Sequence, residues 1–250
     1  MYKFSNMTGK VAVVTGSARG IGRGIALALS EKGFKVIVNF RKSEREAKKV
    51  VSSIREKGGE AAAFKADVTK PEHARRLINT AVSKWNRLDI LVNNVGDFLV
   101  KNTSATDSSG WRKIVDSNLM SAVNCSYYAQ KEMRRRRWGR IVNIGYAESE
   151  RVGAFPRIAA YASSKTAVII LTKSLAKELA PFGITVNCVS PGIMESSIAG
   201  SKIQKKMLKK IPAGRIGKAE DVASAVIWLV SDEASYVTGA NVVVSGGWGI

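Results

Sequence analysis

The stretch "TGSARGIG", residues 15–22, lies between a valine-rich run and a segment with helical periodicity. Its three glycines allow a sharp turn and a close approach of the backbone to a bound anion. The following helix would direct unpaired N–H groups and the positive end of its dipole toward that anion. A glycine-rich turn without a ligand is the alternative, but a junction of strand and helix at this point favours a site for dinucleotide phosphates. The residues expected to form it are Gly16, Ser17, Arg19, Gly20, Ile21 and Gly22.

From this loop onward, strand-like and helix-like segments alternate to the end of the chain. Runs rich in valine and isoleucine predict strands at 10–16, 35–40, 61–68, 88–94, 139–145, 184–192 and 241–247. Helical patterns separate them, at 20–33, 43–59, 70–85, 111–137, 159–183, about 197–210 and about 219–230. Continuously apolar strands that alternate with helices are typical of a parallel sheet covered on both faces. We therefore predict an α/β chain with a single domain, residues 1–250, in a doubly wound Rossmann fold with a seven-stranded parallel sheet.

The supply of reactive side chains narrows the possible chemistry. The 250 residues include one histidine, His73, and two cysteines, Cys125 and Cys188. This excludes His-based catalytic triads and Cys/His zinc sites, so no metal is expected, and acid–base chemistry must use Tyr, Lys, Asp, Glu or Ser. The cysteines lie far apart in apolar segments, which predicts buried free thiols. No signal peptide and no apolar run of roughly 20 residues is present, so we expect a cytoplasmic protein that does not engage a membrane.

The charge of the chain is strongly positive, with 40 Lys and Arg against 20 Asp and Glu, a net charge of +20. Such a field attracts phosphates, acidic proteins and nucleic acid. Nucleic acid is not expected as a partner, because no base-reading element or interleaved aromatic pattern accompanies the charge. A highly charged surface that favours solubility and a surface for a specific acidic partner remain equal alternatives.

Several short motifs give the chain a family resemblance. The phosphate loop reads T-G-x-x-x-G-I-G, and it resembles the fingerprint of the short-chain dehydrogenase/reductase family. Further motifs of that family follow in the family's order: "NNVG" at 93–96 with Val95 for the usual alanine, Asn118 in "DSNLM", "YASSK" from Tyr161 to Lys165, and "SPG" at 190–192. The resemblance covers nearly the whole chain. It implies a nicotinamide cofactor, a small substrate lid at about 193–215, and a homotetramer.

The choice of nicotinamide cofactor depends on the end of the second strand, "VIVNFRKSE". Enzymes that use NAD usually carry an acid there, which binds the ribose hydroxyls. Here the position is Asn39, and Arg41, Lys42 and Ser43 follow it. A basic cluster pairs with a 2′-phosphate, and Arg19 in the glycine loop can approach the same group. Although Arg41 and Lys42 could be two more solvated charges, the missing acid favours NADP(H).

The resemblance assigns further cofactor contacts outside the loop. Asp67 and Val68 would flank the adenine, and Asn94 and Gly96 would line the ribose side. The segment after the sixth strand would contact the nicotinamide amide and the phosphates, through Pro191, Gly192, Ile193 and Ser196.

Tyr161 and Lys165 are the candidates for acid–base catalysis. They are four residues apart on a predicted helix, so both project from one face. A free tyrosine titrates near pH 10, and a nearby ammonium lowers that pKa toward working pH. An amphipathic helix with an exposed Tyr and Lys is the alternative. In the mechanism that the resemblance implies, Tyr161 protonates the developing alkoxide, Lys165 lowers the pKa of Tyr161 and binds the nicotinamide ribose, and Asn118 holds a water.

A serine is missing from the expected site. The family carries a serine or threonine at the end of the fifth strand that donates a hydrogen bond to the substrate carbonyl, and losing such a donor typically costs about 10²–10³ in rate. Here Gly145 is followed by Tyr146. Tyr146 could donate through its phenol, or Ser149 could enter from the loop. Otherwise the donor is absent and the protein is a weak or differently specialised reductase, with Tyr146 packed as an apolar lid.

A run of four arginines, Arg134–Arg137, ends the helix before the fifth strand. One or two cations there would favour the helix dipole, but four circle the helix and cannot share one partner. The run resembles the basic segment at the same place in 3-oxoacyl-ACP reductases, where an acidic acyl-carrier protein docks. Lysines in "GSKIQKKMLKK", residues 200–210, add a second basic stretch in the lid. A solvated face is the alternative for each stretch.

Taken together, the sequence predicts an NADPH-dependent carbonyl reductase that transfers hydride to a ketone, most like the 3-oxoacyl-ACP reductases, with an acyl-thioester or another small molecule as substrate. One alternative is a dehydrogenase of the same family that acts on a sugar, polyol or steroid. Another is an NADP-binding protein with vestigial catalysis, because Tyr146 replaces the usual serine.

Overall fold

The computed structural model describes residues 8–195 and 206–250. One seven-stranded parallel sheet runs through the molecule in the order β3-β2-β1-β4-β5-β6-β7, which confirms the predicted fold class. The strands are β1 (Val11–Val14), β2 (Lys35–Phe40), β3 (Ala61–Lys65), β4 (Ile90–Asn93), β5 (Gly139–Ile144), β6 (Ile184–Pro191) and β7 (Asn241–Val244).

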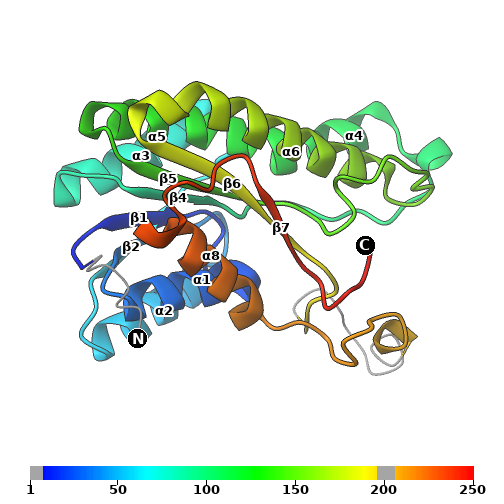
Figure 1. The fold of residues 1–250 in the computed structure, drawn as a ribbon, viewed down its shortest axis with the longest axis horizontal. Coiled ribbons are helices and arrows are strands. Elements are labelled where there is room, and N and C mark those ends of the chain that lie inside the picture. Colours follow the sequence, from blue (N-terminus) through cyan, green and yellow to red (C-terminus); the bar gives the residue numbers. More distant parts are fainter. Residues whose placement is uncertain (1–7, 196–205) are drawn as a thin grey trace.

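Helices cover both faces of this sheet (Figure 1). One layer contains α1 (Gly20–Glu31), α2 (Glu44–Glu56) and α8 (Ala219–Val230). The other contains α3 (Pro71–Trp85), α4 (Ser108–Val115), α5 (Ser121–Arg136) and α6 (Ala159–Leu179). No helix in the described ranges combines the length and the hydropathy that a membrane span requires.

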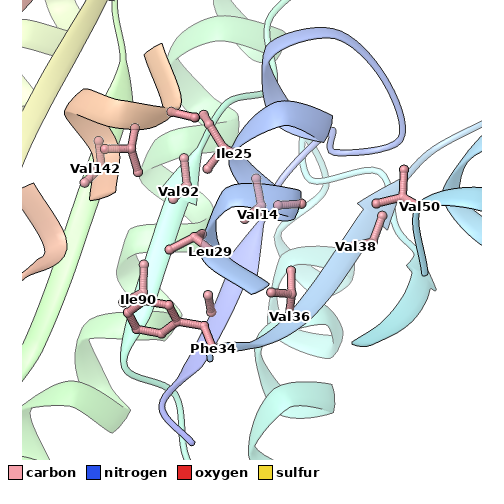
Figure 2. Packing of buried hydrophobic residues seen from close by; sticks show 14 of the residues in the cluster. Val14, Ile25, Leu29, Phe34, Val36, Val38, Val50, Ile90, Val92 and Val142 are labelled. Carbon is pink, nitrogen blue, oxygen red and sulfur yellow. The ribbon is translucent and has the colours of Figure 1, made fainter. Parts of the chain in front are cut away.

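The alternation of β-strand side chains divides the core into two clusters. In one of them, Val14, Val36 and Val92 of the sheet pack against Ile25 and Leu29 of α1 (Figure 2). All five side chains are completely buried, and each such burial contributes about 1.5–3 kcal/mol relative to exposure. The second cluster lies between the opposite face and α3, α5 and α6, and it contains Cys125. Both cysteines are buried free thiols, as predicted.

The strand order indicates where along the carboxyl ends of the strands a binding site is expected. All strands are parallel, but the order in which they are added changes sides at β1. Strands β2 and β3 lie on one side of β1, and β4 and the later strands lie on the other. A crevice outside the carboxyl ends of the strands is expected at such a reversal. The loops after β1, β4, β5 and β6 begin at this edge, so they bring together residues that lie far apart in the sequence.

The predicted helix at 111–137 is not continuous. Residues Asp116–Met120 form a π-helical turn between α4 and α5. The amide nitrogen of Asn118 donates hydrogen bonds to the carbonyl oxygen of Ile114 at 3.0 Å and to that of Asp97 at 2.8 Å. A side chain that bonds within the helical ladder widens the turn there, and this turn carries Asn118 to the edge of the sheet.

Candidate active site

The glycine loop is packed tightly against the end of β4. Gly16 has a φ of +60°, which favours glycine. A Cβ on Gly22 would lie 2.5 Å from Nδ2 of Asn94 and 2.7 Å from the carbonyl oxygen of Gly16. The side chain of Asn94 donates to the carbonyl oxygen of Thr15 at 2.9 Å. Asn94, which was expected at the cofactor's ribose side, therefore also holds the loop in place.

The start of α1 suits an anion. The first N–H groups of a helix have no partner within it, and here Arg19 makes no capping bond and no acid lies in the first turn. Ile21 and Gly22 lie in this first turn. A shallow groove of about 1070 Å³ opens between this end of α1 and α2. The basic residues that line it are Arg19, Arg23, Arg45, Lys48 and Lys49, and Glu44, Glu46 and Glu56 line it as well. The cations at the start of α1, Arg19 and Arg23, therefore fit the phosphates of a dinucleotide.

Two of the predicted cofactor residues, Ser17 and Asn39, are internal braces. Asn39 is 1% exposed; its Oδ1 accepts from the backbone N–H of Gly16 at 3.0 Å, and its Nδ2 donates to the carbonyl oxygen of Ala66 at 3.1 Å. Ser17 is fully buried and donates to the carbonyl oxygen of Val14 at 2.7 Å. Asn39 thus ties the glycine loop to the chain after β3, and its side chain does not face outward at the end of β2.

Exposed cations lie beyond this brace. Arg41 forms an ion pair with Asp67 at 3.8 Å, and the Arg41 side chain is 47% exposed. A cleft of about 490 Å³ lies next to this pair, and its lining includes Arg41, Asp97, Arg112 and Lys113. Lys42 is exposed and Val68 is buried. Ser43 precedes α2 and makes no side-chain capping bond.

Two of the candidate acid–base residues, Asn118 and Lys165, meet at Gly96, just after β4, and Tyr161 lies near Lys165. A Cβ on Gly96 would overlap Oδ1 of Asn118 and lie 3.4 Å from Nζ of Lys165. Nζ of Lys165 donates to the carbonyl oxygen of Ile144 at 2.7 Å and lies 5.8 Å from the ring centroid of Tyr161. Oδ1 of Asn118 is buried and accepts no hydrogen bond from the described residues. The cluster therefore combines a phenol, an ammonium with further N–H donors, and a free carbonyl oxygen.

Burial dominates the electrostatics of this cluster. It lowers the pKa of Lys165 from 10.5 to about 8, because the charged form loses its hydration. Burial also raises the pKa of the Tyr161 phenol above its ordinary value. The latter result is opposite to the expected lowering by Lys165, and its cause is the loss of hydration of the buried phenol. Tyr161 is therefore held as the neutral phenol, which is the form that donates a proton.

Tyr146 occupies the position after β5 where a serine was expected. Its ring packs edge-on against Tyr161, with the centroids 5.4 Å apart, and against Trp248 at 5.7 Å. Its hydroxyl donates to Oε2 of Glu148 at 2.5 Å. Ser149 is 1% exposed, and its Oγ accepts from the backbone N–H of Tyr146 at 3.0 Å. Of the two proposed donors, Tyr146 packs directly against Tyr161, and Ser149 holds the backbone of Tyr146.

The loop after β6 completes the edge. The backbone N–H of Gly192 donates to the carbonyl oxygen of Val244 at 3.0 Å, and a Cβ on Gly192 would lie 2.7 Å from that of Ser245. Pro191 is the last residue of β6, and the carbonyl oxygen of Ile193 accepts from Gly217 at 3.0 Å. Ser196 lies outside the described residues, as does the middle of the expected lid.

The arginine run is bonded within the chain. Arg134 pairs with Glu178 at 2.5 Å and Arg135 with Glu132 at 3.1 Å. Arg136 donates to the carbonyl oxygen of Asn86, and Arg137 donates to that of Pro181 at 2.9 Å. Arg134, Arg136 and Arg137 therefore fasten the end of α5 to neighbouring segments, while Arg135 pairs within the helix. Arg135, Arg136 and Arg137 are also exposed, as are Lys206, Lys209 and Lys210.

Three residues near Tyr161 were not singled out from the sequence. Phe98 packs edge-on against Tyr161, with the centroids 4.8 Å apart, and it is 60% exposed. Trp248 and Glu148 both contact Tyr146. Glu148 lies two residues after Tyr146, so its closeness in sequence could have pointed to this contact. Trp248 is far from β5 in the sequence, and no local pattern could have pointed to it.

Comparisons with known proteins agree with this geometry. A family model described as "Enoyl-(Acyl carrier protein) reductase" matches residues 16–249. The 3-oxoacyl-[acyl-carrier-protein] reductase FabG of Staphylococcus aureus strain Mu50 is 40% identical over 243 residues, which cover 95% of this chain and 97% of that protein. The 3-oxoacyl-[acyl-carrier-protein] reductase of Synechocystis sp. strain PCC 6803 is 38% identical over 245 residues, with 96% and 97% covered.

Solved structures are also similar over almost the full length. A crystal structure of a dehydrogenase/reductase from Sinorhizobium meliloti 1021 superposes with a TM-score of 0.90 at 32% identity, and covers 97% of this chain and 96% of that one. Another from the same organism, provisionally described as a short-chain alcohol dehydrogenase, gives a TM-score of 0.92 at 34% identity, with 98% of both chains covered. The chain belongs to the short-chain dehydrogenase/reductase family, whose members are oxidoreductases that use a nicotinamide cofactor.

Proposed function

We propose that this protein is an NADPH-dependent carbonyl reductase that acts on a ketone. The observation that carries the proposal is that Asn118 and Lys165 meet at Gly96, and that Nζ of Lys165 also lies 5.8 Å from the ring centroid of Tyr161. A phenol can protonate an oxygen on which negative charge develops, and a nearby ammonium stabilises the phenolate that this leaves.

The proposed mechanism assigns one task to each side chain. When bound, the nicotinamide supplies a hydride to the carbonyl carbon. Tyr161 donates its phenolic proton to the carbonyl oxygen, and burial keeps that proton in place until then. Lys165 stabilises the resulting phenolate by its charge, while its bond to the carbonyl oxygen of Ile144 fixes its position. Asn118 Oδ1 offers an acceptor through which a water can return a proton.

The preference for NADPH rests on charge at the end of β2. Arg41 and Lys42 are exposed there, and Arg19 stands at the start of α1. These cations can pair with a 2′-phosphate, and neither NADH nor NAD offers them that partner. Equal dissociation constants for NADPH and NADH at physiological salt would contradict this preference.

The first substrates to test are 3-oxoacyl thioesters, because the two relatives above are named for that activity. An acidic acyl-carrier protein would dock on exposed basic residues. These are Lys206, Lys209 and Lys210 of the lid, and Arg135, Arg136 and Arg137, which also bond within the chain. By analogy with the family, we also propose a homotetramer and a cytoplasmic location. A sugar, polyol or steroid substrate remains the second candidate, and vestigial catalysis, which the replacement of serine by Tyr146 favours, is the third.

The test is NADPH oxidation, followed spectrophotometrically, with acetoacetyl thioesters and a panel of small ketones. Tyr161→Phe is expected to abolish turnover while the dissociation constant for NADPH stays nearly unchanged. Turnover by that variant would refute the role of Tyr161. Tight NADPH binding without oxidation on any ketone would instead support the alternative of vestigial catalysis.

A further inference from the structure

The hydroxyl of Tyr146 differs from a serine hydroxyl in what it can offer to a substrate. Tyr146 directly follows the Gly145 that extends β5, since the backbone N–H of Gly145 still donates to the carbonyl oxygen of Val189 at 2.8 Å. The ring is fixed between those of Tyr161 and Trp248, at 5.4 and 5.7 Å. This position beside Tyr161 is where a second group contacting the substrate would stand.

The single hydrogen of this phenol is already in use. It lies in the 2.5 Å bond from Tyr146 to Oε2 of Glu148. An ionised carboxylate only accepts hydrogen bonds, so the donor in this bond must be the phenol. Burial and the charge of Glu148 both raise the pKa of Tyr146, which keeps the proton on the phenol. What Tyr146 can offer to a neighbouring molecule is therefore a lone pair on its oxygen.

The other hydroxyl of the loop does not restore the missing donor. Ser149 is 1% exposed, and its Oγ accepts from the backbone N–H of Tyr146. Thr166 holds the same turn by donating to the carbonyl oxygen of Ser149 at 2.8 Å. Phe98, on the exposed side of Tyr161, has no hydrogen-bonding group. Phe98 and Tyr146, whose rings pack against that of Tyr161, therefore provide apolar surface and an acceptor.

We propose that this site selects ketones with a hydroxyl on the carbon next to the carbonyl, and that the Tyr146 oxygen accepts the hydrogen bond from that hydroxyl. The inference rests on the proposed reductase function and narrows its substrate class. In the reaction, the ketone carbon gains a hydride from NADPH and its oxygen gains the proton of Tyr161. NADPH becomes NADP⁺, and the product is a vicinal diol whose original hydroxyl is unchanged.

Three small ketones separate the contributions. Hydroxyacetone carries the donor, 2-butanone replaces the hydroxyl by a methyl group of similar size, and methoxyacetone keeps the electron-withdrawing oxygen without the O–H. We expect kcat/KM for hydroxyacetone to exceed that for both others by about 10-fold or more, as for one well-placed hydrogen bond.

Variants then assign the preference to Tyr146. In Tyr146→Phe, the ratio of kcat/KM for hydroxyacetone to that for methoxyacetone should fall about 10-fold, because the acceptor is lost. Intrinsic reactivity and substrate size cancel in this comparison of ratios. Glu148→Ala frees the phenolic hydrogen, so methoxyacetone should improve relative to hydroxyacetone. Tyr236→Phe, at a fully exposed tyrosine, is the matched control and should leave the ratio unchanged.

Binding provides a readout that does not require turnover. With NADP⁺ present, ligand-observed NMR should show 1,2-propanediol binding more tightly than 1-methoxy-2-propanol to the wild type, but not to Tyr146→Phe. If the ratio of kcat/KM for hydroxyacetone to that for methoxyacetone is the same in the wild type and in Tyr146→Phe, the inference is overturned. The proposed reductase function would still stand. If no ketone or thioester is reduced, the proposed function fails, and equal binding of the two alcohols would then refute the acceptor role as well.

Discussion

The burial of Lys165 should lower the free energy of unfolding, although the residue serves catalysis. Burial lowers its pKa from 10.5 to about 8, and the side chain is 4% exposed. The difference corresponds to about 3 kcal/mol, because one pKa unit equals about 1.4 kcal/mol. Below pH 8 the folded protein bears the full cost of a buried ammonium. Between pH 8 and 10.5 the folded form releases the proton while the unfolded chain still holds it, so the cost falls as pH rises.

The substitution Lys165→Met tests this reasoning. Methionine keeps the length and removes the charge, so the variant should lose activity and gain stability at pH 7. The lost bond to the carbonyl oxygen of Ile144 offsets about 1 kcal/mol of that gain. The change with pH is the sharper quantity, because it depends only on the pKa values of Lys165 in the folded and unfolded states. From pH 7 to pH 10, the stability advantage of the variant should shrink by about 2–3 kcal/mol.

The assay is equilibrium urea unfolding, followed by tryptophan fluorescence, of both proteins at pH 7 and pH 10. Lys209→Met, at an exposed lysine, is the control and should show no such change with pH. If the difference in unfolding free energy between wild type and Lys165→Met is the same at both pH values, Lys165 does not carry a lowered pKa and the argument fails.

Three further results are expected. The kcat/KM for ketone reduction should fall as pH rises through about 8, because Lys165 loses its charge there. Tyr161 keeps its proton over this range, since burial raises its pKa. A kcat/KM that stays constant up to pH 10 would contradict this expectation. Arg41→Ala should raise the dissociation constant for NADPH about 10-fold and change that for NADH little, and an equal effect on both would argue against a 2′-phosphate contact. Gly22→Ala should destabilise the fold by about 1–3 kcal/mol in thermal unfolding, since its Cβ would lie 2.5 Å from Asn94. Gly153→Ala, where the nearest neighbour lies 3.8 Å away, should have little effect.

Sequence reasoning worked best where a repeating pattern or a backbone rule determined the outcome. The predicted strand at 35–40 coincides with β2, and the predicted helix at 70–85 contains all of α3, which begins at Pro71. Continuous apolar strands identified the parallel sheet, and the order of short motifs identified the family. The residues that meet at Gly96 were also named, because spacing and resemblance both pointed to them.

The remaining features depend on contacts between distant segments. Periodicity could not reveal the π-helical turn, since it arises from bonds of one side chain, Asn118, to two carbonyl oxygens. The raised pKa of Tyr161 follows from its packed surroundings, which include Phe98 and Tyr146. Trp248 reaches Tyr146 only because β7 lies beside β6 in the sheet.

The buried brace at Asn39 has a consequence for redesigning cofactor preference. Aspartate at this position would keep an acceptor for Gly16, but it would replace Nδ2, which donates to the carbonyl oxygens of Phe64 and Ala66, by an oxygen that repels them. It would also place a negative charge where only 1% of the residue is exposed. A mutant library meant to convert the enzyme from one dinucleotide to the other should therefore keep residue 39 constant and vary residues 40–42, where a new side chain can change recognition without loosening the loop.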